Sequence, residues 1–327
     1  MNTNRWAILG ACLGASLGAI APIVSAQSYP NKLIRLVVGY PPGGANDILT
    51  RHVAPRLGDA LSTPVVVENR AGANGIIGAE AVAKAAPDGY TLMMGGLTPL
   101  VLNQLTYPKL PYNAVSDFVG ITTVASSPVI FSVHPSMPAN SLGELVALAK
   151  AKRGNLNFAT VGTGGSTRVV LELFNLTAGV EVKYVPYKGA AQGLTDLIAG
   201  SLDGMAIDFP VLYPFVKDRK LRALAISSEN RHPLLPDLRT AAEQGFPGLT
   251  CGNWYALMAP AKTPRPIIDR LHAATTKFVA APEMKQQLLA IGVESMVQSS
   301  PEAFNGFLQS ELARWGKVIK TAGIEAE

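Results

Sequence analysis

Val38-Gly-Tyr-Pro-Pro-Gly-Gly-Ala-Asn-Asp-Ile48 is the stretch that decides the fold. It follows the apolar run Leu33–Gly39, which predicts a buried strand, and it opens a predicted helix that Asn46 or Asp47 is placed to cap. Its Gly-Gly pair removes side chains where the backbone must come close to another group. A buried strand that turns through glycines into a helix is the repeating unit of an α/β fold.

The same alternation of strand and helix continues along most of the chain. Most of the strand candidates are continuously apolar, as expected for strands that are covered on both faces. Ser141–Glu144 and Ser299–Glu302 have the spacing of helix-starting caps. The alternation predicts largely parallel sheets with right-handed crossovers. The predicted strands are Leu33–Gly39, Val65–Glu68, Thr91–Met94, Ile121–Val124, Val129–Val133, Asn157–Thr160, Val182–Val185, Met205–Ile207, Arg222–Ile226 and Tyr255–Met258.

A polar break at Ser126-Ser-Pro128 divides one apolar stretch into two predicted strands. One compact sheet rarely needs such a break, whereas a chain that passes from one lobe to another does. Asn253–Pro260 is the best candidate for the return crossing. We therefore predict a two-lobed α/β protein with two mixed, mostly parallel sheets flanked by helices and a cleft between the lobes. The predicted lobes are residues 27–125 plus 252–327 and residues 126–251.

The N-terminus has the pattern of an export signal. A short positive start at Arg5 precedes the apolar stretch Trp6–Val24, and Val24-Ser-Ala26 offers the small residues that signal peptidase accepts. We predict that residues 1–26 are a cleaved signal peptide. A retained membrane anchor and lipidation at Cys12 are the alternatives.

Composition and charge exclude several classes of protein. The formal net charge is only +5, and the basic residues are scattered, so the concentrated basic face of a nucleic-acid-binding protein is missing. Cleavage would leave Cys251 as the one cysteine, which cannot form an internal disulfide. No sequence pattern for a metal or cofactor is present, and we predict neither. A monomer is expected.

A second glycine-rich loop in the other half of the chain has the same physics as the first. Thr160–Thr167 follows a predicted strand and precedes the predicted helix Arg168–Ala178. Each loop alone is also compatible with an ordinary turn, but both present bare amides at the positive end of a helix. Facing each other across a cleft, they would hold an anion at one end or a dicarboxylate at both. The predicted ligand-binding residues are Tyr40, Pro42, Gly43, Gly44, Asn46, Thr98, Thr163, Gly164, Gly165, Ser166, Thr167 and Asp208.

Four side chains near these loops have two possible roles each, and a fifth has one. The Thr98 hydroxyl could contact the ligand or cap a helix, and Asp208 could accept a hydrogen bond from a ligand ammonium or amide or cap the helix that follows it. Arg168 and Lys188 could add positive charge to the pocket or lie on the surface. Asp47 is expected to be structural, because its carboxylate would repel a bound carboxylate.

Seven motifs resemble those of one family, in that family's order and over nearly the whole mature chain. They are Tyr40–Asp47, Val67–Gly75, Ala86–Thr91, Val185–Ala190, Asp196–Gly200, Leu224–Ile226 and Ala259–Pro264. Together they are similar to the receptors of tripartite tricarboxylate transporters, the Bug family. Arg168 stands where the family often has histidine, and Arg239 replaces its usual proline.

The resemblance implies a periplasmic type II solute-binding fold. It also implies that the loops around Gly43-Gly44 and Gly164–Thr167 hold a ligand carboxylate, partly through ordered waters, and that the receptor serves membrane transporter subunits. The expected ligand is an amino-dicarboxylate, a tricarboxylate or an aromatic acid. The alternatives are a ligand sensor of an envelope signalling system and a hydrolase that uses Ser166. We expect no enzyme, because the Gly-x-Ser-x-Gly elbow is missing and the histidines lie far apart in the sequence.

Overall fold

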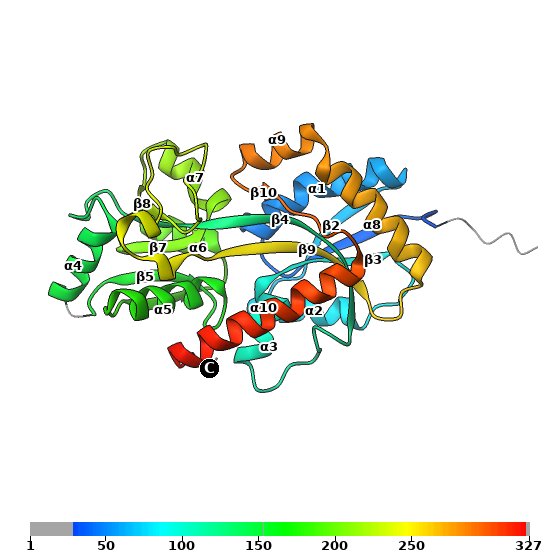
Figure 1. Cartoon of the computed structure of the whole chain (residues 1–327), viewed down its shortest axis with the longest axis horizontal. Coiled ribbons are helices and arrows are strands. Elements are labelled where there is room, and N and C mark those ends of the chain that lie inside the picture. The colour runs from blue at the N-terminus through cyan, green and yellow to red at the C-terminus, as the bar shows by residue number, and fades with distance from the viewer. Residues whose placement is uncertain (1–28, 153, 325–327) are drawn as a thin grey trace, which may run out of the picture.

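The computed structural model describes residues 29–152 and 154–324 (Figure 1). The predicted signal peptide, residues 1–26 with Cys12, lies outside them. The strands are β1 (Ile34–Val38), β2 (Val65–Asn69), β3 (Thr91–Gly96), β4 (Phe118–Val133), β5 (Asn157–Val161), β6 (Lys183–Tyr187), β7 (Gly204–Asp208), β8 (Arg222–Ile226), β9 (Gly252–Pro260) and β10 (Glu294–Ser295). The helices are α1 (Ala45–Leu61), α2 (Ile76–Ala83), α3 (Asn103–Thr106), α4 (Leu142–Lys152), α5 (Ser166–Ala178), α6 (Ala190–Ile198), α7 (Phe209–Lys217), α8 (Arg265–Ala280), α9 (Pro282–Ala290) and α10 (Pro301–Ala322). Four short helical turns complete the elements: η1 (Ala73–Gly75), η2 (Thr98–Leu102), η3 (Ala242–Gln244) and η4 (Pro247–Leu249).

Two long strands join the lobes. The strand order is β2-β1-β3-β9-β4-β7-β5-β6, and β8 and β10 also pair with β4. The outer strands of each lobe pair in parallel, whereas β4 and β9 run antiparallel to their neighbours. Figure 1 shows β4 and β9 passing side by side from one lobe to the other. The predicted two-lobed α/β fold with mixed sheets is confirmed.

The predicted break at Ser126-Ser-Pro128 is wrong, because β4 is one continuous strand. Proline removes only one backbone donor, and the pairing continues through it: Ser127 lies opposite Asn253 and Pro128 opposite Gly252. Gly252 permits this close approach, since a Cβ there would lie 2.7 Å from the Ser127 carbonyl oxygen. The strand changes partners in this segment, from β10 at Ala125 and Ser126 to β7 from Val129 onward.

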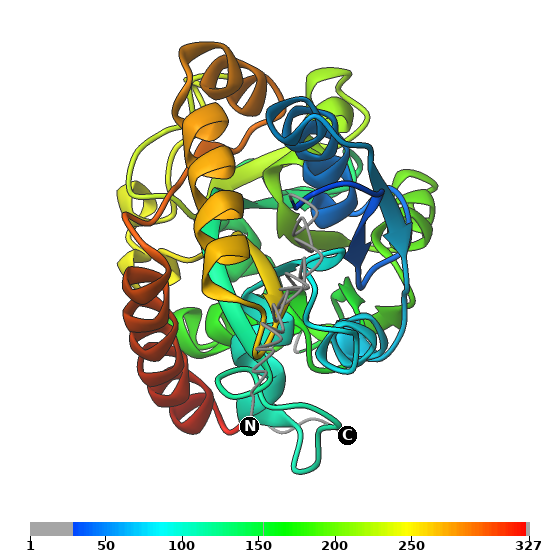
Figure 2. The ribbon, with the colours of Figure 1, turned by 90° about the vertical axis from the view of Figure 1, so that its right-hand side faces the viewer.

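Two buried apolar clusters cover opposite faces of the sheet, and each contains residues from both lobes. Neighbouring residues of the crossing strands alternate between the clusters, as the period of a strand requires. Phe131 and Trp254 belong to one cluster, and Ile130 and Tyr255 belong to the other. Figure 2 looks along the long axis and shows helices on both sides of the central strands. No helix of residues 29–152 and 154–324 is both long and apolar enough to cross a bilayer.

The C-terminal helix α10 is tied to the crossing strand β9. Its start is capped one residue later than the Ser299–Glu302 spacing predicted, because the Ser300 hydroxyl accepts a hydrogen bond from the Ala303 N–H at 3.1 Å. Along the helix, the buried Glu311 Oε2 accepts from the Trp254 Nε1 at 2.8 Å and from the Trp315 Nε1 at 3.1 Å. The helix also contacts α5 of the other lobe, so it bridges the two lobes beside β4 and β9.

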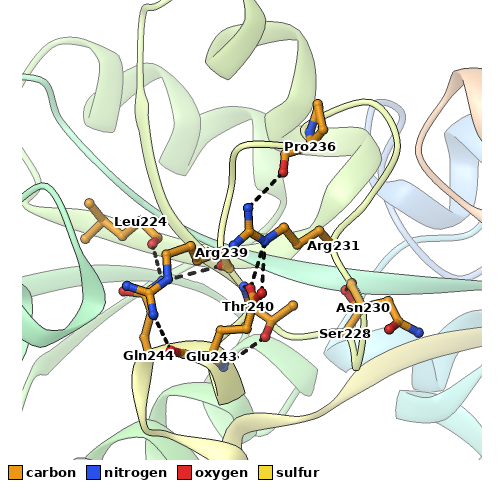
Figure 3. Close-up of polar contacts among 9 residues, drawn as sticks. All are labelled: Leu224, Ser228, Asn230, Arg231, Pro236, Arg239, Thr240, Glu243 and Gln244. Atoms are coloured by element: carbon orange, nitrogen blue, oxygen red, sulfur yellow. Dashed lines mark hydrogen bonds and ion pairs between the residues drawn. The ribbon is translucent and has the colours of Figure 1, made fainter.

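The loop after β8 is braced by its own polar groups (Figure 3). Thr240 and Glu243 form a reciprocal capping box: the Thr240 N–H donates to Glu243 Oε2 at 2.7 Å, and the Glu243 N–H donates to Thr240 Oγ1 at 3.0 Å. Arg231 pairs with the same Glu243 carboxylate at 3.0 Å. The Arg239 guanidinium donates a hydrogen bond to the Glu243 backbone carbonyl, so it also stabilises this loop.

Candidate functional site

The structure contains a small cavity of about 70 Å³ at the junction of the two lobes. One water molecule needs about 10–15 Å³ by the same measure, so the cavity has room for a small molecule. Eight of the predicted ligand-binding residues line it: Tyr40, Gly44, Asn46, Thr98, Gly165, Ser166, Thr167 and Asp208. Pro42, Gly43, Thr163 and Gly164 lie outside this lining. Both predicted loops therefore reach the cavity wall, and only some of the predicted residues of each loop face the cavity.

Three helices begin at the cavity wall with glycine N-caps. The caps are Gly44 before α1, Gly165 before α5 and Gly189 before α6, and a glycine has no side chain with which to cap the helix that it precedes. The first backbone N–H groups of a helix have no partner within the helix, and the helix dipole makes them attractive to an anion. The start of α6 was not among the predicted ligand-binding residues, although it lies in the motif Val185–Ala190.

The Asp47 side chain holds the first loop in place through contacts within its own lobe. Its carboxylate accepts hydrogen bonds from the Gly43 N–H at 3.0 Å and from Asn69 Nδ2 at 2.8 Å, and it forms an ion pair with Arg51 at 2.9 Å. Burial opposes ionisation, but these bonds outweigh it and hold the pKa of Asp47 below its ordinary value. The Gly43 amide is thus engaged inside the protein. Gly43 instead makes the turn, with a φ of 85° in the region that favours glycine.

The second loop contacts the opposite lobe. The Thr167 hydroxyl accepts from the Val161 N–H at 2.8 Å and braces the loop. The Ser166 N–H donates to Thr98 Oγ1, which comes from the other lobe, at 3.3 Å. A Cβ added to Gly162 would lie 1.7 Å from Asn74 Oδ1, again across the cleft. The lobes are therefore in contact around the cavity.

Asp208 is the one ionisable carboxyl group in the described lining. Its side chain is buried, and its Oδ1 accepts a hydrogen bond from Asn253 Nδ2 at 2.5 Å. Burial raises the pKa of Asp208 to about 6, although the bond from Asn253 acts in the opposite direction. The residue precedes α7, but its side chain makes no capping hydrogen bond, so the helix-capping alternative is not what the structure shows.

Positive side chains stay away from the cavity. Arg168 forms an ion pair with Glu172 at 2.7 Å and lies over the Tyr184 ring, 3.9 Å from its centroid, so it follows the helix surface. Lys188 lines a neighbouring hollow together with Thr163. No lysine, arginine or histidine of the described residues lines the cavity itself. Amides and hydroxyls are the groups available to an anion there.

The cavity lining also includes residues that the sequence analysis did not assign to the site. Asn253 and Tyr255 come from the crossing strand β9, and Asn74 comes from η1. The remaining wall is largely apolar, with Pro41, Leu97, Pro99, Ile207 and Trp254 among its residues. Asn74 lies in the motif Val67–Gly75, which is a signal that could have identified it. The described residues contain no group of three His, Cys, Asp or Glu side chains placed to hold a metal ion.

Sequence comparison places the chain among transport receptors. Residues 49–324 match the family described as "Tripartite tricarboxylate transporter family receptor". The chain is 35% identical to protein BugT of Bordetella pertussis over 325 residues, which cover 99% of each protein.

Solved structures agree with this placement. The chain is similar to Rpa4515 of R. palustris, solved with adipate, at 33% identity and a TM-score of 0.88, covering 91% of this chain and 100% of that one. It is also similar to MatC (Rpa3494) of Rhodopseudomonas palustris, solved with bound malate, at 30% identity and a TM-score of 0.83, covering 89% and 100%. A third similar structure is the periplasmic binding protein BugD, at 29% identity and a TM-score of 0.86, covering 91% and 100%. The predicted resemblance and the periplasmic-binding-protein-like fold are confirmed, and the chain belongs to the tripartite tricarboxylate transporter receptor family.

Proposed function

We propose that this protein captures a small carboxylate between its two lobes and delivers it to a tripartite tricarboxylate-type membrane transporter. The convergence of three glycine-capped helix starts on one cavity between the lobes supports this proposal most directly. The adipate and malate held by two similar proteins belong to the same class of ligand. The ligand of this chain is accordingly a short organic acid.

The available donors are sufficient for tight binding without an arginine. A micromolar dissociation constant corresponds to about −8 kcal/mol. A charge-assisted hydrogen bond contributes roughly 1.5–3 kcal/mol, and ordering the site costs several kcal/mol. Five or six bonds from amides and hydroxyls therefore suffice. The cavity offers these from the starts of α1, α5 and α6 and from the Thr98 and Ser166 side chains.

We also propose where the receptor acts and how its chain is divided between the lobes. Residues 1–26 direct export to the periplasm and are then removed, and the mature receptor acts as a monomer. Its lobes are residues 27–125 plus 252–327 and residues 126–251. The change of β4 partners between Ser126 and Val129 supports the first boundary.

Hydrolysis by Ser166 finds no support in the cavity. A serine nucleophile needs a base within hydrogen-bond reach. The Ser166 hydroxyl instead accepts a hydrogen bond from Asn253 Nδ2 at 3.3 Å, and no histidine of the described residues lines the cavity. The family is one of solute-binding receptors. We therefore propose binding without chemical conversion.

Gly44→Asp tests the site. A side chain fits at this position, because an added Cβ would meet only the Pro41 carbonyl oxygen at 3.8 Å. Its carboxylate would stand where the guest carboxylate binds, and repulsion of about 3–4 kcal/mol at roughly 4–5 Å predicts at least a hundredfold weaker binding. Gly143→Asp is the matched control, since it adds the same charge to the first turn of α4, at an exposed position. Calorimetry with adipate and L-malate should show unchanged affinity for the control; equal affinity of the Gly44→Asp variant would refute the site.

A further inference from the structure

We propose that Asp208 selects the guest by binding it as a neutral carboxylic acid, which donates its proton to a carboxylate of the guest. Capture then takes up one proton from solvent for each guest bound. The inference rests on the proposed function and adds to it the chemical form of the site. Asp208 is the one carboxyl group in the described lining of a cavity whose other polar groups are amides and hydroxyls.

Asp208 lies beside the backbone amides at the start of α5. Asn253 Nδ2 lies 2.5 Å from Asp208 Oδ1 and 3.3 Å from Ser166 Oγ. Asp208 Oδ1 and Ser166 Oγ are therefore within about 6 Å of each other. A guest carboxylate bound next to Ser166 would be close enough to Asp208 to shift its pKa. Ser166 is the first residue of α5, so the carboxyl group lies next to one of the three helix starts. An ionised Asp208 would repel a carboxylate bound there.

No positively charged side chain of the described residues lines the cavity beside Asp208. The titratable side chains around Asp208 are Tyr255 on β9, Tyr40 before α1, Cys251 before β9 and His232, whose ring lies 4.1 Å from the ring of Phe209, the residue after Asp208. Burial raises the pKa of Tyr40, Tyr255 and Cys251 and lowers the pKa of His232, so all four are neutral near pH 7. With no cation in the described lining, a proton is the available means of neutralising Asp208.

Tyr255 places a second donor beside Asp208. Tyr255 is buried and faces the cavity, and its hydroxyl makes no well-formed hydrogen bond to a described residue. Its phenol lies close enough to Asp208 for the two groups to interact: the carboxyl group raises the pKa of Tyr255, and the hydroxyl favours the ionised form of Asp208 without outweighing burial. Buried polar groups are nearly always paired. A guest carboxylate could accept from this hydroxyl and from protonated Asp208 together, which would complete the hydrogen bonding of both residues.

The consequence is a pH-dependent affinity. Burial leaves the pKa of Asp208 in the ligand-free protein at about 6, so the group is mostly ionised at pH 7 and above. A guest carboxylate favours the protonated form and raises this pKa again. Affinity should be nearly constant below pH 6 and should fall about tenfold for each pH unit above it, until the pKa of the bound state is reached.

Calorimetry can count the proton directly. Titrations of the wild-type protein with adipate, L-malate and L-aspartate at pH 5.5–8.5 give the pH profile. Repeating them at pH 8 in Tris and in HEPES, which differ in heat of ionisation, gives the number of protons taken up from the dependence of the heat on the buffer. We expect close to one proton per guest at pH 8 for adipate and L-malate. Asp208→Asn should bind both with a flat pH profile and no proton uptake, because an amide donates without titrating. Asp59→Asn, an exposed residue of α1, is the matched control and should behave as wild type.

Three results would overturn the inference. Zero proton uptake with a flat wild-type profile would mean that Asp208 does not change its protonation state on binding, while the proposed function would stand. Preference for L-aspartate, lost in Asp208→Asn, would mean that the ionised carboxylate accepts from a ligand ammonium. Absence of binding by every acid at every pH, with a normal thermal unfolding transition, would remove the inference and the proposed function together.

Discussion

Asp208→Asn should stabilise the ligand-free protein at neutral pH. The folded protein raises the pKa of this carboxyl group from 3.8 to about 6, because burial removes the charged form from water. One pKa unit corresponds to about 1.4 kcal/mol, so ionised Asp208 lowers the free energy of unfolding by about 3 kcal/mol. The neutral amide of asparagine avoids this charge and can still accept the hydrogen bond from Asn253.

The pH dependence fixes the sign of the effect. Below about pH 3 the carboxyl group is protonated in both the folded and the unfolded protein, and the two variants should differ little. Between about pH 4 and pH 6 the unfolded chain releases its proton first, so wild-type stability falls relative to the variant. Above about pH 6 the difference should stay constant at about 3 kcal/mol.

Urea unfolding at pH 4.5, 6 and 8 measures this difference directly. The protein should first be unfolded and dialysed, so that a retained ligand does not stabilise the wild type by mass action. The free energy of unfolding of Asp208→Asn minus that of wild type should rise by about 2 kcal/mol over this range, from about 1 kcal/mol at pH 4.5 to about 3 kcal/mol at pH 8. A difference that is the same at all three pH values would contradict the raised pKa. A variant less stable at pH 8 would show that the ionised form is favoured.

Three further perturbations test the contact between the lobes at the cavity and the C-terminal helix. Gly162→Ala should weaken adipate binding at least about tenfold by calorimetry, because its Cβ would overlap Asn74 Oδ1; Asn74→Ala in the same chain should restore part of the affinity. Glu311→Leu should lower the free energy of unfolding by about 2–3 kcal/mol in urea, because two buried indole N–H groups lose their acceptor. Ser300→Ala should lower it by about 1 kcal/mol through loss of the cap of α10, and an unchanged value would mean that the cap bond adds nothing.

The strands could be predicted from sequence because a strand that is buried on both faces consists of consecutive apolar residues. The predicted strand Arg222–Ile226 matches β8, and the predicted Asn157–Thr160 falls one residue short of β5. The two-residue β10 has no such signal, since Glu294 and Ser295 pair with β4 only because the tertiary fold brings them there. The break at Ser126-Ser-Pro128 misled because a proline marks the loss of one donor, not the end of a strand.

The site was less predictable, because a glycine-rich loop does not reveal where each amide points. Gly43 and Gly44 are adjacent, yet the Gly43 amide bonds to Asp47 and only Gly44 lines the cavity. Local sequence indicated that Asp47 is structural, but not that it would use one of the two amides. Asn253 was recognised as part of a crossing strand, and its bond to Asp208 depends on tertiary placement.

Asp208 differs from the rest of the described cavity lining because it is a carboxyl group that can carry a negative charge. An anion site made only of amides and hydroxyls would attract any small carboxylate, since each such guest gains the same hydrogen bonds. A buried carboxyl group beside the start of α5 adds a condition, because the guest must supply an acceptor for its proton or a donor for its charge. The same group destabilises the ligand-free protein at neutral pH, and a bound guest that favours its protonated form relieves that penalty. Selectivity and lower stability of the empty receptor therefore have one physical source, the carboxyl group that Asn253 holds against the helix start.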